Sequence, residues 1–150
     1  MKVVVQRAGR ASVSIGGALH SEIGAGLLLL VGIGRQDTDA DLEWMSRKIP
    51  ALRIFEDESG KMNLSVREAS GAILAVSQFT LYADASRGNR PGFSGAAPPE
   101  VARELFDRFV DALRKESGCR VETGRFGADM QVDLLNDGPV TIILESPAKP

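Results

Sequence analysis

The sequence has few of the residues on which metal sites and acid–base catalysis usually depend. Its 150 residues include one Cys and one His. Because Cys119 has no second cysteine to pair with, an internal disulfide and a cysteine-rich zinc site are excluded, as is typical of a protein from a reducing compartment. A catalytic zinc site usually needs two or three histidines, and His20 follows Gly16-Gly17 in a predicted hairpin, apart from any polar cluster. Any catalysis must therefore use hydroxyls, carboxylates, backbone amides or the substrate itself.

An excess of one charge and a long apolar run are also missing. With 18 basic and 20 acidic residues the net charge is −2, so binding to nucleic acid by bulk charge is excluded and only a local patch could contact phosphates. The longest apolar stretch, residues 24–34, is about half of the ~20 residues that a membrane-spanning helix needs. The apolar run at the N-terminus is too short for a signal peptide. We therefore expect a soluble, cytoplasmic protein without a membrane partner, folded as one domain over residues 1–150.

Hydrophobic periodicity predicts an α/β domain with more strands than helices. Continuous apolar runs at 27–31 and 72–76 are typical of strands buried on both faces. The other predicted strands have alternating or short apolar patterns: 3–5, 13–15, 19–23, 53–55, 121–123, 131–135 and 140–145. Two main helices are predicted, one from an N-cap at Thr38 to an end set by Pro50 and one opened by Pro98-Pro99 and closed by Gly118.

Several familiar motifs are absent or incomplete. Gly32-Ile33-Gly34 resembles the start of a dinucleotide-binding fingerprint, but Asp37 stands where the third glycine is needed, so we interpret it as a plain turn. The sequence has no G-x-S-x-G elbow, which argues against an unrelated serine esterase. Asp39 and Asp41 fall at a helix cap and are interpreted as solvated surface. No cofactor and no metal site is predicted.

Two polar segments break the pattern of buried strands. Ser77-Gln78-Phe79-Thr80 places two hydroxyls and an amide where a buried strand emerges, which fits either a binding site or a strand end that caps its own turn. Asn136-Asp137-Gly138-Pro139 predicts, by local rules, a hairpin turn before an edge strand. On composition alone, Arg7 is a surface strand residue and Met130 fills a gap in the core.

The order of these motifs resembles the D-aminoacyl-tRNA deacylases of the bacterial and eukaryotic type. The resemblance covers essentially the full chain, and no single block is specific by itself. The matching blocks are Val5-Gln6-Arg7, Leu52-Arg53-Ile54-Phe55, Gly60-Lys61-Met62-Asn63, Ser77-Gln78-Phe79-Thr80-Leu81, Arg90-Pro91-Gly92-Phe93, Thr123-Gly124 with Phe126-Gly127-Ala128, and Asn136-Asp137-Gly138-Pro139-Val140-Thr141.

The resemblance implies a reaction, a fold and a partner. Proteins of this family hydrolyse the ester that joins a D-amino acid to the terminal ribose of tRNA, a form of chiral proofreading that recycles the tRNA. The implied fold is a single α/β domain, a β-barrel-like mixed sheet with two main helices. The implied assembly is a homodimer with an active site completed across the subunits. The expected partner is the acceptor end of aminoacylated tRNA, with no DNA and no cofactor.

The resemblance also implies the site residues. The catalytic segment would be Ser77, Gln78, Phe79 and Thr80, and the substrate-binding residues would be Gly138, Pro139, Met130 and Arg7. The Gly138-Pro139 peptide would be cis and enter the partner's site, held by Arg7. A wall of backbone carbonyls cannot yield to an L side chain, so it can separate enantiomers that carry the same groups. Glycine has no side chain to exclude, and such a wall alone would not reject glycyl-tRNA.

Two mechanisms and one other function stay open. Backbone N–H groups of Phe79 and Thr80 are the expected donors to the oxyanion. Activation of water by the vicinal ribose hydroxyl is favoured over a covalent Thr80 intermediate. A few phosphate contacts are expected, with a shallow salt dependence, from the arginines Arg35, Arg87 and Arg90. The alternative function is a non-catalytic dimeric module that binds RNA ends.

Overall fold

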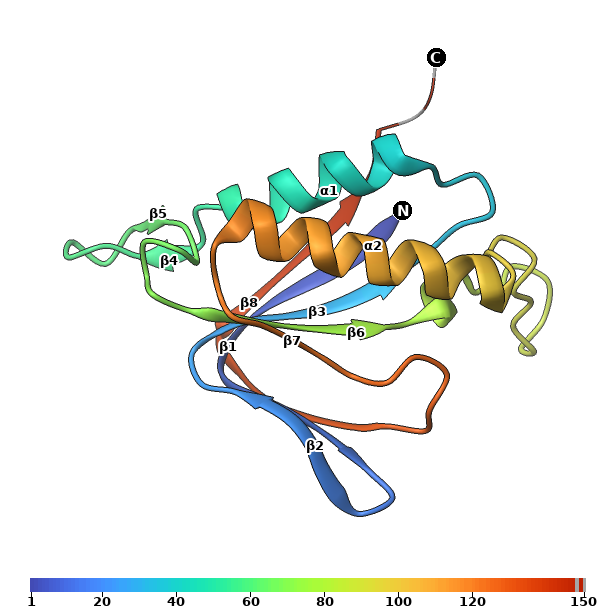
Figure 1. Cartoon of the computed structure of the whole chain (residues 1–150), viewed down its shortest axis with the longest axis horizontal. Helices are drawn as coiled ribbons and strands as arrows, with labels where there is room; N and C mark the ends of the chain where they lie inside the picture. The colour runs from blue at the N-terminus through green and yellow to red at the C-terminus, as the bar shows by residue number, and fades with distance from the viewer. Residues whose placement is uncertain (148, 150) are drawn as a thin grey trace.

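One long N-terminal strand connects the parts of the sheet. In the computed structural model, which describes residues 1–147 and 149, β1 (Lys2–Ile15) pairs antiparallel with three strands. These are β2 (Ala18–Ile23), β3 (Gly26–Gly32) and β8 (Gln131–Glu145). Every second residue of β1 faces the core, and Val3, Val5 and Val13 are fully buried. The strand is thus the common neighbour on which both halves of the sheet are aligned (Figure 1).

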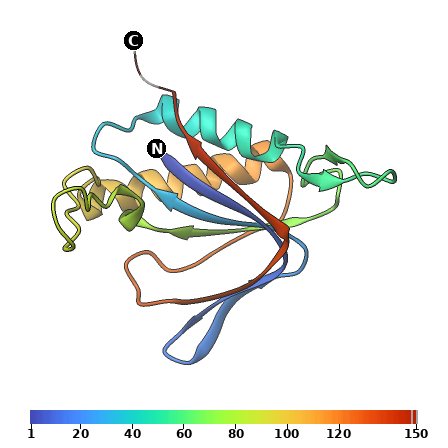
Figure 2. The same ribbon diagram turned by 180° about the vertical axis from the view of Figure 1, so that it is seen from behind.

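The remaining strands extend the sheet in parallel and make it mixed. β6 (Ala72–Ser77) pairs parallel with β3, and β7 (Val121–Thr123) pairs parallel with β6. β4 (Phe55–Glu56) and β5 (Met62–Leu64) form a separate two-stranded hairpin. The sheet curls so that β2 contacts β6 and β7, and the Ser21 hydroxyl donates to the carbonyl of Thr123 at 2.8 Å (Figure 2). The sheet is therefore nearly closed, as the expected barrel-like fold requires.

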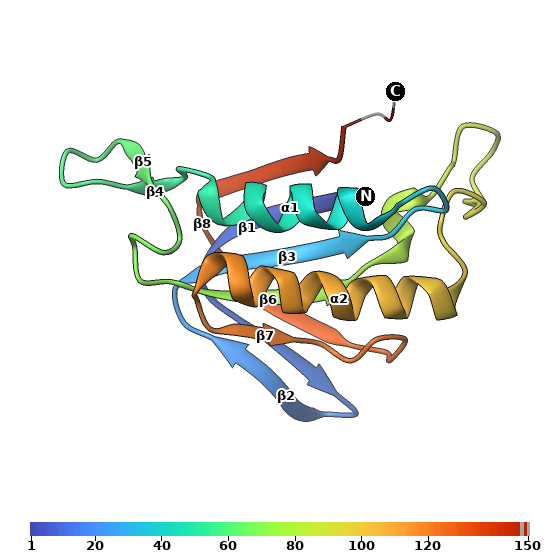
Figure 3. The same ribbon diagram turned by 45° about the horizontal axis from the view of Figure 1, so that its top comes forward.

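Two helices cover one face of the sheet. α1 (Asp39–Ala51) and α2 (Pro99–Ser117) lie side by side across it, and the short η1 turn (Phe79–Tyr82) follows β6 (Figure 3). β3 is buried on both of its faces because one set of its side chains, including Leu29, packs under the helices, whereas Leu28 points into the curl of the sheet. The α/β fold class with two main helices is confirmed. No helix within residues 1–147 and 149 is long and apolar enough to cross a membrane.

The predicted hairpin turn at Asn136-Asp137-Gly138-Pro139 is wrong. β8 runs through this segment as one strand, because both of its halves pair with the same long strand β1. Gln6 pairs with Thr141 and Ala8 with Asn136, so residues 137–140 lie opposite Arg7 alone. The segment is a large bulge in a continuous strand, and a bulge of this kind projects its extra residues out of the ladder.

Two local boundaries also differ from the prediction. Pro50 does not end the first helix before itself but sits in its last turn, one residue before the helix ends at Ala51. The strand predicted at 53–55 begins at Phe55 instead, as β4. The predicted N-cap at Thr38 and the left-handed Gly118 at the end of α2 are confirmed. Asp41, interpreted from the sequence as solvated surface, is buried.

Asp41 fastens the start of α1 to the end of β8. Its carboxylate accepts hydrogen bonds from the Thr38 N–H at 2.7 Å, from the Thr38 hydroxyl at 3.0 Å and from the Ser146 hydroxyl at 2.7 Å. Lys149 lies 3.3 Å from the same carboxylate. Burial by itself would raise the pKa of Asp41, but the hydrogen bonds from Ser146, Thr38 and Lys149 outweigh it and hold the pKa well below its ordinary value. The ionised form is thus favoured by the folded state.

We expect Asp41→Asn to destabilise the fold by about 2 kcal/mol at neutral pH. The substitution replaces a buried, ionised carboxylate that accepts several hydrogen bonds by a neutral amide. The wild-type free energy of unfolding should fall as pH drops below about 4, since only the unfolded chain then takes up a proton at this carboxyl. That part of the acid dependence should be missing from Asp41→Asn. Urea unfolding between pH 2.5 and 7 measures both. The control is Asp39→Asn, which removes an exposed ion pair between Asp39 of α1 and Arg108 of α2. It should cost less than about 1 kcal/mol. Equal losses from the two variants would contradict the assignment.

Candidate functional site

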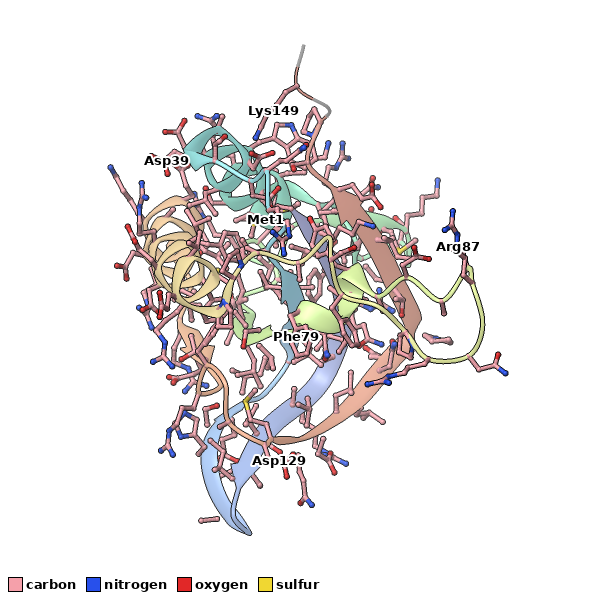
Figure 4. The ribbon with its side chains drawn as sticks, turned by 90° about the vertical axis from the view of Figure 1, so that its right-hand side faces the viewer. Met1, Asp39, Phe79, Arg87, Asp129 and Lys149 are labelled. Atoms are coloured by element: carbon pink, nitrogen blue, oxygen red, sulfur yellow. The ribbon has the colours of Figure 1, made fainter. Side chains whose placement is uncertain are left out.

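A cavity of about 310 Å³ lies where β3 and β6 end. One wall is the segment Ser77, Gln78 and Phe79, and the opposite wall is residues 126–130. In Figure 4 the labels of Phe79 and Asp129 mark these two sides. The carboxyl ends of parallel strands meet at one edge of a sheet, so β6 and β7 bring the two segments together although they are far apart in sequence. The cavity is thus a property of the parallel half of the sheet.

The Ser77–Thr80 segment presents backbone donors without partners. The N–H of Gln78 bonds the carbonyl of Val31 at 2.8 Å and closes the strand. The N–H groups of Phe79 and Thr80, which come next, have no hydrogen-bond acceptor among the residues that the structure describes. Free N–H groups at the end of a rigid strand form a ready site for a developing negative charge. The segment does not cap itself with these donors.

The side chain of Gln78 orients the hydroxyl of Thr80. Its side-chain amide nitrogen donates a hydrogen bond to Thr80 Oγ1. Thr80 is not part of the cavity wall itself but lies next to it through this bond. An amide cannot accept a proton at neutral pH, so the bond orients Thr80 without making it a better nucleophile. The lone histidine is no alternative base, because His20 is exposed on β2.

Met130 lies both at the cavity and against the core, as the core interpretation predicted, whereas its role in binding substrate stays a prediction. It lines the cavity, and it also packs against the second core cluster inside the curl of the sheet. A Cβ at Gly124 would lie 2.6 Å from Met130 Sδ, so the glycine of the Thr123-Gly124 block leaves the space that the methionine fills. The thioether thus forms an apolar part of the wall.

Most of the residues that line the cavity were not among the predicted site residues, and three of them bear on its chemistry or its walls. Ala102 of α2, Phe126 and Asp129 all line the cavity. A signal for Phe126 existed, because Phe126-Gly127-Ala128 is one of the blocks that carry the family resemblance. Nothing in the sequence brings Ala102 to this place, since it belongs to the apolar stripe of α2. Within residues 1–147 and 149 no cluster of His, Cys, Asp and Glu is arranged to hold a metal ion.

The other predicted residues form a second cluster around the bulge of β8. Arg7 is 7% exposed; its Nε donates to the carbonyl of Asp137 at 2.9 Å and its Nη1 to the carbonyl of Ile54 at 2.8 Å. The surface interpretation of Arg7 is therefore wrong. Asn136 closes the bulge by accepting from the N–H of Val140 at 2.9 Å. The Gly138-Pro139 peptide between them is cis and exposed to solvent.

One chain does not bring the two clusters together. Gly138, Pro139 and Arg7 are not among the residues that line the cavity. Three strand-to-strand steps separate β8 from β6, about 14 Å along the sheet. Arg7 pairs with Leu27, four residues before the Val31 that pairs with Ser77, which adds an offset of about 13 Å.

An aromatic pair and a long loop form the rim of the cavity. The rings of Phe79 and Phe93 meet edge to face with centroids 5.0 Å apart, and both are partly open to solvent. Of the three arginines expected to contact phosphates, Arg35 donates to the carbonyl of Ser94. Arg87 and Arg90 are exposed, and Figure 4 shows Arg87 on the outer part of the loop, away from Phe79.

Comparison with known proteins gives consistent results over the whole chain. A sequence model of the family described as D-Tyr-tRNA(Tyr) deacylase matches residues 4–145. A protein of Chlorobaculum tepidum named D-aminoacyl-tRNA deacylase is 73% identical over 150 residues, which is 100% of both chains. The solved structure of a c-Myc DNA unwinding element binding protein is 51% identical, covers 99% of this chain and 100% of its own, and superposes with a TM-score of 0.92.

A more distant structure shares the fold. It is described as a probable eukaryotic D-amino acid tRNA deacylase, covers 95% of this chain and 97% of its own, and has a TM-score of 0.79 at 19% identity. At that identity the likeness concerns the arrangement of the elements, which is the one described above.

The backbone at Gly138 yields a testable expectation. Its φ is +135°, and a Cβ there would lie 2.8 Å from Val140 Cγ2 and 3.0 Å from Arg7 Nη2. Gly17 is a matched control, since its φ is +81° but a Cβ would meet nothing within 4 Å. Both Gly→Ala variants should lose about 1–3 kcal/mol from backbone strain. Gly138→Ala should lose at least about 1 kcal/mol more, because its methyl group overpacks the bulge. Urea unfolding measures the difference, and equal losses would show that the bulge accommodates the methyl.

Proposed function

The chain belongs to the D-Tyr-tRNA(Tyr) deacylase family, and we propose that it hydrolyses D-aminoacyl-tRNA in the cavity at the ends of β3 and β6. The reaction is hydrolysis of a carboxylic ester. Water adds to the ester carbonyl, the bond to the ribose oxygen breaks, and that oxygen takes up a proton, so that a free D-amino acid and tRNA result. The observation that carries the proposal is the pair of unpartnered N–H groups, one on a residue that lines the cavity and one on the residue after it.

The backbone N–H groups of Phe79 and Thr80 supply the main stabilisation of the transition state. The carbonyl oxygen becomes negative when water adds, and two fixed hydrogen-bond donors can stabilise that charge without rearranging. A single donor of this kind contributes about 2.7–4 kcal/mol in enzymes where it has been measured. An aminoacyl ester is already activated, so this stabilisation supplies a large part of what the reaction needs.

The substrate provides the base. No histidine is near the cavity, and the amide of Gln78 cannot activate Thr80. The hydroxyl next to the ester on the terminal ribose lies within reach of the attacking water in any bound form of the substrate. It accepts a hydrogen bond from that water and positions it, a role that a covalent Thr80 intermediate would make unnecessary. Ser77 and Gln78 keep the floor of the site in place.

Enantiomer selection comes from a second copy of this chain. We assign the exposed Gly138 and Pro139 carbonyls to the cavity of a partner subunit, where they occupy the space of an L side chain and attract the substrate ammonium. The separation of the two clusters within one chain supports this, because the bulge cannot serve its own cavity. The outer edge of β8 has no partner strand in the described part of the chain, and Leu135 and Ile143 on that strand are 54% and 72% exposed.

Contact with tRNA is confined to its acceptor end, in the cytoplasm where tRNA is charged. The net charge of −2 provides no general attraction, so affinity depends on a few local cations such as Arg87 and Arg90. The single-stranded end of tRNA offers unstacked bases, and the terminal adenosine fits the apolar wall of the cavity beside Phe79 and Met130.

The function is tested by release of tyrosine from charged tRNA. Purified protein should release D-tyrosine at least about 10²-fold faster than L-tyrosine, since an unyielding clash costs several kcal/mol and each 1.4 kcal/mol is tenfold. Glycyl-tRNA should also be hydrolysed. Binding of tRNA ends without any release would favour the non-catalytic module instead, and equal release of both enantiomers would remove the role of the carbonyl wall.

The role of Thr80 is tested by one variant and one substrate. Thr80→Ala should keep kcat within about tenfold of wild type, whereas loss of a covalent nucleophile costs about 10⁴-fold or more. A substrate with a 2′-deoxy terminal ribose should be hydrolysed about 10²–10⁴-fold more slowly, because it lacks the group that positions water. Single-turnover rates measure both. The opposite pattern, with Thr80→Ala inactive and the deoxy substrate normal, would establish the covalent route.

A further inference from the structure

A cation without an ion-pair partner in the described part of the chain lies beside two residues of the cavity wall, Phe126 and Gly127. Arg103 of α2 is exposed, and its guanidinium carbon lies 5.2 Å from the centroid of the Phe126 ring. A Cβ at Gly127 would lie 3.9 Å from Arg103 Nη2. Within the described part of the chain Arg103 has no hydrogen bond and no ion pair, although Asp107 follows one turn later on the same helix. Stacking on an aromatic ring leaves the N–H groups of a guanidinium free to bind an anion.

A second cavity lies on the other side of Phe126. It measures about 300 Å³, close to the first, and it is bounded by α2 and the end of β7. Phe126 lines both cavities, so its ring is the wall that they share. Phe106, whose ring centroid lies 6.2 Å from that of Phe126, forms an apolar side of the second cavity. Arg103 therefore stands next to the boundary between two sites of similar size.

We propose that the second cavity binds the nucleotide that precedes the terminal adenosine of tRNA, and that Arg103 binds the phosphate that joins the two. This rests on the proposed function, which places the terminal adenosine in the first cavity with its ester at Ser77–Thr80. We place the 5′ side of that adenosine toward residues 126–130, which form the other wall of the first cavity. The next phosphate then crosses the wall that Phe126 forms. Arg103 is the cation that lies over that ring, whereas Arg114, which also lines the second cavity, is paired with Asp111.

The charges around the second cavity determine which part of the nucleotide enters it. Asp107 and Asp111 both line it, so a phosphate inside would be repelled. Asp111 is neutralised by Arg114 at 3.2 Å, whereas Asp107 has no ion pair among the described residues. A carboxylate of this kind accepts a hydrogen bond from the exocyclic amine of cytosine, which uracil lacks. The base therefore enters the cavity and the phosphate stays outside at Arg103, and cytosine is preferred over uracil.

Short ester substrates separate this site from the first. We would measure hydrolysis of the D-tyrosyl esters of adenosine, cytidylyl-adenosine and uridylyl-adenosine by the wild-type protein. The KM for the cytidylyl-adenosine ester should be about a hundredfold lower than for the adenosine ester, because it gains one contact to the phosphate and one to the cytosine amine, each about tenfold. The uridylyl-adenosine ester should fall between them. Equal KM values for the three esters would overturn the proposal.

Arg103→Gln tests the phosphate contact directly. It should raise the KM for the cytidylyl-adenosine ester about tenfold and leave the KM for the adenosine ester unchanged. It should also lower the slope of log KM against log salt for charged tRNA by about 0.7, the value for one phosphate on a single strand. Arg103→Lys should recover much of the salt slope. Lys115→Gln, exposed near the far end of the same helix, makes the same change in net charge and should alter neither quantity.

The outcomes are distinguishable from failure of the proposed function. If Arg103→Gln and Lys115→Gln behave alike while wild type hydrolyses all D-esters, the second site is wrong and the deacylase function stands. If wild type hydrolyses neither D-aminoacyl-tRNA nor the esters, the proposed function itself fails and the further inference with it. A thermal unfolding midpoint of Arg103→Gln equal to wild type would confirm that its effect is on binding and not on folding.

Discussion

The antiparallel pairing of β1 with β8 is the constraint on which the rest of the molecule depends. Both halves of β8 are aligned on the same strand. Most of the mismatch between them lies opposite Arg7, and a second register shift lies between Ala8 and Arg10. The buried guanidinium of Arg7 then connects the bulge to the rest of the fold, because it donates both to the carbonyl of Asp137 in the bulge and to the carbonyl of Ile54. Because the extra residues can neither slide along the ladder nor fold inward, Gly138 and Pro139 are held outward in a fixed position. The projection of the bulge thus follows from the strand register together with the hydrogen bonds of Arg7.

The two halves of the sheet have different tasks. The antiparallel half, β1 with β8, carries the projection, and the parallel half, β3 with β6 and β7, ends in the cavity with its unpartnered N–H groups. Neither half offers a strong base or a metal-binding cluster in the described residues. The site that we propose therefore relies mainly on backbone groups, which stabilise charge and exclude volume but do not titrate. Such a site suits an ester that is already reactive and whose own hydroxyl can assist.

The sequence predicted most of the fold and part of the site. Apolar periodicity located β3, β6 and both helices, because these elements are decided by local pattern and by clear caps such as Thr38 and Gly118. The Asn136-Asp137-Gly138 segment was misassigned because its turn chemistry is real locally but is overridden by a strand more than 120 residues away. Phe126 and Arg103 could not be placed together from sequence, since their contact depends on how α2 crosses the end of β7. The Ser77–Thr80 segment stood out from its polar pattern at a strand end, but its expected role, and that of Arg7, came only from the family resemblance.

Pro139 has another effect on the strand that carries it. β8 presents its outer edge along fifteen residues, and an open edge of that length is a template to which foreign strands can add. A proline has no N–H to donate, and the bulge around it changes the spacing of the neighbouring carbonyls along the edge. An incoming extended chain would find two short ladders that do not share one spacing. The dipeptide that we assign to substrate choice thereby also disfavours the edge-to-edge addition of strands that leads to fibres.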